Sequence, residues 1–142
     1  MLKNIPALMP PELMKIMLEM GHGDELLLCD GNYPKFGCPE RCVRMDGNGI
    51  SEILEMILQF FPLDVYVEHP TSLMAVVAGD PYQPEIWEEY RAIGNKYESK
   101  GLREETLEKP AFYEKGRHCY ACVATGEKAL YANVILKKGV VK

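Results

Sequence analysis

The stretch Met20-Gly21-His22-Gly23-Asp24-Glu25-Leu26-Leu27-Leu28-Cys29-Asp30 decides how this chain folds and where its chemistry should lie. Residues 25–29 are short, apolar and bounded by polar turn formers, which predicts a buried strand. The glycines before them favour a turn, so His22 should lie beside a helix end and Asp30 at a strand end. An imidazole and a carboxylate in one short unit that folds back on itself suggest an acid–base site.

The residues upstream predict the helix that delivers His22. Pro10 and Pro11 open an apolar-periodic segment, because proline tolerates the first helical turn. Gly21 should end this helix in the left-handed conformation that glycine adopts freely. The negative end of the helix dipole would then favour protonated His22 by about 0.3–1 kcal/mol where exposed, which suits it to proton exchange. The alternative is that His22 is an ordinary loop histidine and Asp30 a turn former.

Length and charge restrict the class of protein. The chain has 142 residues, enough for one domain with its own core, and we expect a single domain over residues 1–142. Its 21 acidic and 16 basic residues leave a net charge of −5, which argues against nucleic acid and membrane partners. Neither a signal peptide nor an apolar run of about eighteen residues is evident, so we expect a cytoplasmic protein.

The rest of the chain alternates between helical and strand patterns. Ser51 should cap a helix over residues 52–61 that Pro62 ends. The loop over residues 33–39 is rich in turn formers and long enough to cover a site. Further apolar patterns predict strands at 43–45, 64–68, 73–77, 119–125 and 134–136, and helices at 84–100, closed by Gly101, and 111–116. Interleaved strands and helices indicate an α/β domain with a central sheet flanked by helices.

The five cysteines are odd in number, which argues against a disulfide framework. The spacings Cys38-x₃-Cys42 and Cys119-x₂-Cys122 invite a zinc interpretation, but residues three apart in a strand point to opposite faces. Cys119 and Cys122 should therefore diverge, so we expect no metal site and interpret Cys29, Cys119 and Cys122 as small core residues. A zinc- or redox-responsive protein built on the two pairs is the alternative.

The tripeptide Tyr131-Ala132-Asn133 stands immediately before the last predicted strand. Asparagine offers both a donor and an acceptor, and free backbone groups at a strand entrance add more, which suits a polyhydroxylated ligand. The alternative is that these residues only form a turn.

Taken together, these motifs resemble the ribose pyranase/fucose mutarotase (RbsD/FucU) family, in particular its fucose branch. The combination of MGHGDE with ATGE, YAN and LKKGV downstream is more specific than any single short motif, and only residues 81–108 match weakly. The matching segments are Pro6–Asp30, Arg44–Gly47, Pro62–Pro70, Ala111–Lys115 and Val123–Val140.

The resemblance implies an isomerase that interconverts the α and β anomers of a free monosaccharide, L-fucose or a close relative, without cofactor or metal. It also implies an α/β fold and a homo-oligomer, often a decameric ring, with sites near subunit contacts. By this resemblance His22 is the acid–base residue and Asp30 a sugar-binding carboxylate. Tyr131, Ala132 and Asn133 would line the sugar through side chains and backbone.

Lys109 stands where the fucose branch commonly has arginine, and lysine offers a point charge rather than a planar fork. We include it among the sugar-binding residues. Met74 or Tyr113 could form an apolar wall for the methyl group of a 6-deoxy sugar. His69 and His118 match no family motif and are interpreted as ordinary residues. The alternatives are a D-ribose pyranase, which interconverts pyranose and furanose forms, and a sugar-binding module without turnover.

Overall fold

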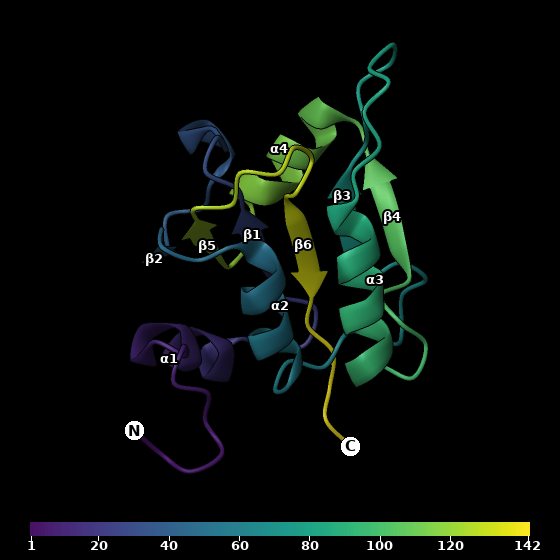
Figure 1. Cartoon of the computed structure of the whole chain (residues 1–142). Helices are drawn as coiled ribbons and strands as arrows, with labels where there is room; N and C mark the ends of the chain where they lie inside the picture. The colour runs from purple at the N-terminus through teal and green to yellow at the C-terminus, as the bar shows by residue number, and fades with distance from the viewer.

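The computed structural model describes all 142 residues and consists of one six-stranded sheet with helices on both faces (Figure 1). The predicted fold class, α/β with a central sheet flanked by helices, is confirmed. The strands are β1 (Glu25–Cys29), β2 (Cys42–Met45), β3 (Thr71–Met74), β4 (Glu104–Leu107), β5 (Ala121–Thr125) and β6 (Val134–Lys137). The helices are α1 (Pro11–Glu19), α2 (Ile50–Leu58), α3 (Ile86–Tyr97) and α4 (Lys109–Arg117), with the short 3₁₀ helix η1 (Lys35–Gly37).

The strand order is β2-β5-β1-β6-β3-β4, and β6 alone runs against its neighbours. The other five strands therefore end at the same edge of the sheet, and β6 begins at that edge. This topology brings the residue after β1, Asp30, next to the residue before β6, Asn133. Loops at the carboxyl ends of strands leave polar groups free, so this edge is where a ligand site is expected.

Alternate residues of β1 face different layers because side chains of a strand alternate across the sheet. Leu26 and Leu28 pack in the larger core beneath α1, α2 and α3, whereas Leu27 and Cys29 pack in a smaller core with Phe112 of α4. All of these side chains are buried. The predicted buried strand over residues 25–29 is confirmed.

The turn that carries His22 differs from the prediction. Gly21 does not take the left-handed conformation; α1 ends at Glu19, Met20 is extended, and Gly23 has φ of 90°. The reason is a turn closed by the Asp24 N–H, which donates to the Gly21 carbonyl at 3.2 Å. Gly23 is the third residue of this four-residue turn, the position that favours glycine in a type II turn. The positive φ that only glycine adopts easily is therefore needed at Gly23, after His22, and not at Gly21, before it.

The segment 64–68 was predicted as a half-buried strand, and this prediction is wrong, because it forms bends. The Asp64 carboxylate accepts a hydrogen bond from the Tyr66 N–H at 3.0 Å, which curls the backbone locally. The Arg103 guanidinium donates to the carbonyl oxygens of Asp64 and Val67 at 2.7 and 2.8 Å. These bonds satisfy polar groups that a strand would have paired with a neighbour.

Several element boundaries also differ from those predicted. Strand β3 begins at Thr71, two residues before the predicted start at residue 73, and β4 was not predicted. Ser51 does not cap α2, which starts after Gly49 and ends at Leu58. The carboxylates of Glu52 and Glu127 instead accept the N–H groups of Gly49 and Ile50 at 3.1 and 3.0 Å. Gly101 has φ of 68° but lies beyond the end of α3 at Tyr97.

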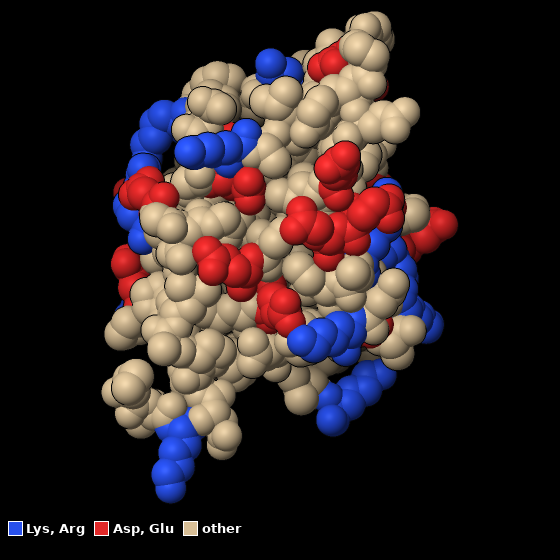
Figure 2. Space-filling model, in the orientation of Figure 1, with Lys and Arg blue, Asp and Glu red and all other residues tan.

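The surface over α2 and α3 carries acidic side chains across its middle, with lysine and arginine toward its edges (Figure 2). This distribution follows the net charge of −5 and makes this face unfavourable for polyanions. None of the helices has both the length and the apolar character that a membrane crossing requires.

We expect Gly126→Ala to destabilise the fold. A Cβ atom at Gly126 would lie 2.0 Å from the Asp46 carbonyl oxygen, where β5 passes the turn after β2. Overpacking of this kind costs about 1–3 kcal/mol or more in the free energy of unfolding. Denaturant unfolding measures the loss, and Gly47→Ala is the matched control because nothing lies within 4 Å of its Cβ position. Equal stability of the two variants would contradict the prediction.

Candidate functional site

A pocket of about 270 Å³ opens at the sheet edge where β1 and β3 end and β6 begins. It brings together four of the sequence-predicted site residues, Asp30, Lys109, Tyr131 and Asn133. They come from the loop after β1, the first residue of α4 and the segment before β6. Residues more than a hundred positions apart in the sequence therefore share one hollow.

Asp30 and Asn133 are fixed to each other. The Asn133 side chain is buried, and its Oδ1 accepts a hydrogen bond from the Asp30 N–H at 2.7 Å. The Asp30 carboxylate accepts from the Asn32 N–H at 3.0 Å. Burial raises the pKa of the Asp30 carboxyl above its ordinary value and outweighs that hydrogen bond, which lowers the pKa. The remaining lone pairs of this carboxylate can accept hydrogen bonds from ligand hydroxyl groups.

Helix α3 holds the other two residues of the tripeptide. The Trp87 indole N–H donates to the Tyr131 carbonyl at 2.7 Å, and the buried Tyr90 hydroxyl donates to the Ala132 carbonyl at 2.6 Å. Tyr131 has φ of 57°, and its hydroxyl donates to Asp80 at 2.6 Å. Ala132 is fully buried and does not line the pocket. Sequence reasoning missed both Trp87 and Tyr90, since their pattern predicts only an apolar helix stripe.

Lys109, Tyr113 and Met74 form the far side of the pocket. The Lys109 Nζ lies 5.8 Å from the centroid of the Tyr113 ring, within range of a cation–π contact. The Met74 side chain is buried at the end of β3. The pocket thus combines charged and amide groups with an apolar wall, a combination suited to a ligand with hydroxyl groups and a methyl group.

His22 lies at the opposite edge of the sheet, in the turn before β1. Its Nε2 is 3.1 Å from Oδ1 of Asp64, and its ring centroid is 5.4 Å from that of Tyr66. The His22 side chain is 45% exposed, whereas that of Asp64 is 4% exposed. A buried carboxylate that hydrogen-bonds an exposed imidazole fixes the orientation of the ring. Sequence reasoning missed Asp64 because it assigned this residue to a strand.

The structure does not bring His22 to the pocket within one chain. The five residues of β1 lie between His22 and Asp30 and span roughly 13–17 Å, since a strand rises about 3.3 Å per residue. One chain therefore presents a polar pocket at one edge of its sheet and the His22–Asp64 pair at the other.

The Asp64 carboxylate should make the stability of the fold depend on pH. Burial alone would raise the pKa of Asp64, but hydrogen bonds from the Tyr66 N–H and the His22 ring outweigh it and leave the pKa below its ordinary value. A lowered folded-state pKa contributes stability that is present above the ordinary value and lost as the pH falls through the folded value. We expect the difference in unfolding free energy between the parent and Asp64→Asn to shrink below about pH 4. A difference that stays constant with pH would contradict this.

The cysteines are arranged differently from either predicted pair. Cys29, Cys119 and Cys122 are buried, as predicted, but Cys119 precedes β5 rather than belonging to it. The sulfur atoms that converge are those of Cys29, Cys38 and Cys122. Burial raises the pKa of the Cys38 and Cys42 thiols to about 11, so both are protonated at neutral pH and are poor nucleophiles.

Comparison with known proteins identifies the family. The model of the RbsD / FucU transport protein family matches residues 3–141. The chain belongs to this family. The RbsD/FucU match covers the helix, turn and strand around His22 as well as the segment before β6, so both edges of the sheet lie within it.

Individual RbsD/FucU relatives match over nearly the whole chain. An L-fucose mutarotase of Actinobacillus pleuropneumoniae is 43% identical over 140 residues, covering 99% of this chain and 97% of that protein. The human fucose mutarotase is 42% identical over 146 residues, covering 98% and 94%. The crystal structure of a Streptococcus pneumoniae fucose mutarotase in complex with L-fucose superposes with a TM-score of 0.93, at 46% identity, over 99% of this chain and 100% of that one.

Proposed function

We propose that this chain is an L-fucose mutarotase, an isomerase that interconverts the α and β anomers of the free sugar. One observation carries the proposal: a chain that matches fucose mutarotases over nearly its whole length places Asp30, Lys109, Tyr131 and Asn133 around one pocket. The pocket supplies what a 6-deoxy sugar requires, hydrogen-bonding groups for the hydroxyls and an apolar wall for the methyl group.

We propose that Asp30, Asn133 and Lys109 form hydrogen bonds with the sugar hydroxyls, and that Tyr131 lines the sugar beside them. The Ala132 side chain is buried and its carbonyl accepts a hydrogen bond from Tyr90, so its backbone N–H is the group left for a contact with the sugar. Met74 and Tyr113 are the residues that would face the methyl group. Lysine at position 109 supplies a point charge with three rotatable N–H donors where arginine would supply a rigid planar fork, so its contact with the sugar is less directional.

We assign proton transfer to His22. Opening of the hemiacetal ring requires a proton to leave the anomeric hydroxyl while another arrives at the ring oxygen, and closure on the other face of the carbonyl reverses both steps. An imidazole can give and take such protons near neutral pH. Asp64 Oδ1 lies 3.1 Å from His22 Nε2 and holds the ring in place, so Asp64 acts as a positioning residue for His22.

We propose that a second copy of the chain completes each site, in a homo-oligomer that could be a decameric ring. His22 and the pocket lie at opposite edges of one sheet, so a single sugar cannot contact both within one chain. An exposed apolar groove of about 730 Å³ beside α1 supports assembly, since exposed apolar surface of this kind marks interaction sites. Met1, Leu2 and Leu18 contribute exposed side chains to it. The free cysteines support a reducing, cytoplasmic location.

Exchange NMR on equilibrated L-fucose tests the proposed activity. The rate of anomer interconversion is recorded without protein, with this protein and with D-ribose in place of L-fucose. We expect faster exchange for L-fucose than for D-ribose. Acceleration confined to D-ribose would favour the pyranase reaction, and saturable binding without acceleration would favour a sugar-binding module; either result would overturn the proposal.

A further inference from the structure

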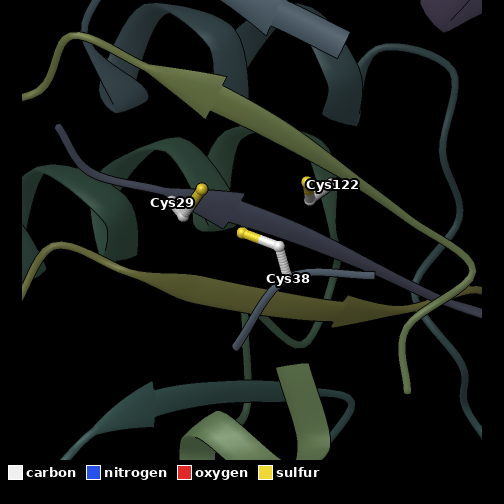
Figure 3. Close-up of side chains that lie close together, drawn as sticks. All are labelled: Cys29, Cys38 and Cys122. Carbon is white, nitrogen blue, oxygen red and sulfur yellow. The ribbon is translucent and has the colours of Figure 1, made fainter. Parts of the chain in front are cut away.

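A group of cysteines lies beside the sugar pocket and has no part in the proposed reaction. The sulfur atoms of Cys29, Cys38 and Cys122 all lie within 4.8 Å of one another. Figure 3 shows Cys38 reaching in from its loop with its sulfur directed toward Cys29. We call these three residues the thiol cluster.

The sheet register builds the thiol cluster. Cys122 of β5 pairs with Leu27 of β1, so Cys29 lies two residues further along β1 and points to the same face. Cys122 also pairs directly with Cys42 of β2, which puts a fourth thiol beside the cluster on that face. Three neighbouring strands and one loop therefore converge on a single group of sulfur atoms.

The thiol cluster can be reached from solvent. Cys29, Cys38 and Cys42 line a pocket of about 360 Å³, and Cys38 and Cys42 are only partly buried. Lys35 and Arg44 line the same pocket. Asp30 and Asp46 also line it, and Asp46 pairs with Arg44, so Lys35 is the cation left to offset the net negative charge of an ion bound by three thiolates.

We propose that the thiol cluster binds one thiophilic d¹⁰ cation, copper(I) or zinc(II). Thiolate sulfur is the ligand that selects these ions, and three sulfurs at about 2.3 Å from an ion lie about 4 Å from each other, within the observed separation. Binding replaces three S–H bonds with three metal–sulfur bonds, and the three protons pass to solvent. No electron is transferred. Cys42 is paired with Cys122 but its sulfur is outside the 4.8 Å group, so it would have to turn toward the ion to supply the fourth ligand that zinc requires.

Metal retention by the reduced protein tests this proposal. Protein kept anaerobic with a phosphine reductant is mixed with one equivalent of copper(I) or zinc(II), freed of unbound metal, and assayed for metal content. We expect one ion per chain, with a rise in the midpoint of thermal unfolding because the ion binds the folded state. The Cys38→Ser variant should lose both the bound ion and the rise in the unfolding midpoint, because it removes the loop ligand with little effect on the core. Cys119→Ala, which removes a buried thiol outside the cluster, should keep both.

Cys42→Ser distinguishes the two ions. Loss of zinc with retention of copper(I) would identify a four-sulfur zinc site that also accepts copper on three sulfurs. Failure of the parent protein to retain either ion would overturn the proposal, as would equal retention by Cys38→Ser and the parent. Metal content is independent of anomer exchange, so this result does not depend on the proposed function.

Discussion

His22→Ala should lower the catalysed rate of L-fucose anomer exchange by about 10²–10⁴-fold, the usual contribution of a positioned acid–base group. The loss should appear with the fold intact, because the His22 side chain is 45% exposed and its polar contact is with Asp64. Exchange NMR measures the rate, and thermal unfolding with circular dichroism reports the fold. His22 occupies a turn whose backbone bonds do not involve its ring, so alanine fits the same conformation.

His118→Ala is the matched control for that experiment. His118 is also exposed, and its Nδ1 lies 2.8 Å from the Glu114 carbonyl oxygen and 3.5 Å from the Glu114 carboxylate, at the end of α4. We expect this variant to exchange anomers at the parent rate. Full activity of His22→Ala would remove His22 from the mechanism, and a comparable loss in both variants would show that the effect is not specific to the proposed site.

Mixing two inactive variants should restore activity. If the pocket of one chain works with His22 of another, His22→Ala and Asp30→Ala chains assembled together form some sites that have both residues intact. For random assembly from equal amounts, about a quarter of the sites are intact, so we expect roughly a quarter of the parent exchange rate. The geometry that motivates this is the five-residue strand β1, which separates the two residues in each chain.

The mixing experiment has a strict control. Chains that carry both substitutions, His22→Ala and Asp30→Ala, cannot form an intact site in any mixture with each other and should stay inactive. If each site were built within one chain, the mixture of single variants would contain no intact site, and its rate would equal the average of the two variants. That result would contradict a site shared between two chains. It would not test the role of His22 in proton transfer, which the His22→Ala variant alone decides.

The sequence predicted those elements whose apolar pattern matches their burial. The run Leu26–Leu28 is buried on both sides of the sheet, so it appears as a continuous apolar segment. Helix α3 also followed its pattern, with Tyr90 buried on one face. Prediction failed at residues 64–68, where alternating side chains suggested a strand. Bonds to Arg103, more than thirty residues away, decide that conformation, and no local pattern contains them.

Strand β4 was missed for a related physical reason. It lies at one edge of the sheet, its side chains are partly exposed, and it contains Glu104 and Glu105. Edge strands carry charged residues because one side lacks a partner, and such residues remove the apolar alternation that indicates a strand. The Ser51 cap was wrong because the N–H groups at the start of α2 are taken by Glu52 and Glu127, the latter from a distant turn.

The sequence alone determined the fold class, the buried strand β1 and the identity of the polar residues at its two ends, because local periodicity and turn chemistry encode these features. Only the tertiary structure decided which residues meet. The antiparallel course of β6 puts Asn133 beside Asp30, the bends after α2 put Asp64 beside His22, and the parallel register of β1 and β5 puts Cys122 beside Cys29. These contacts depend on strand order and register, which the packing of the whole chain selects.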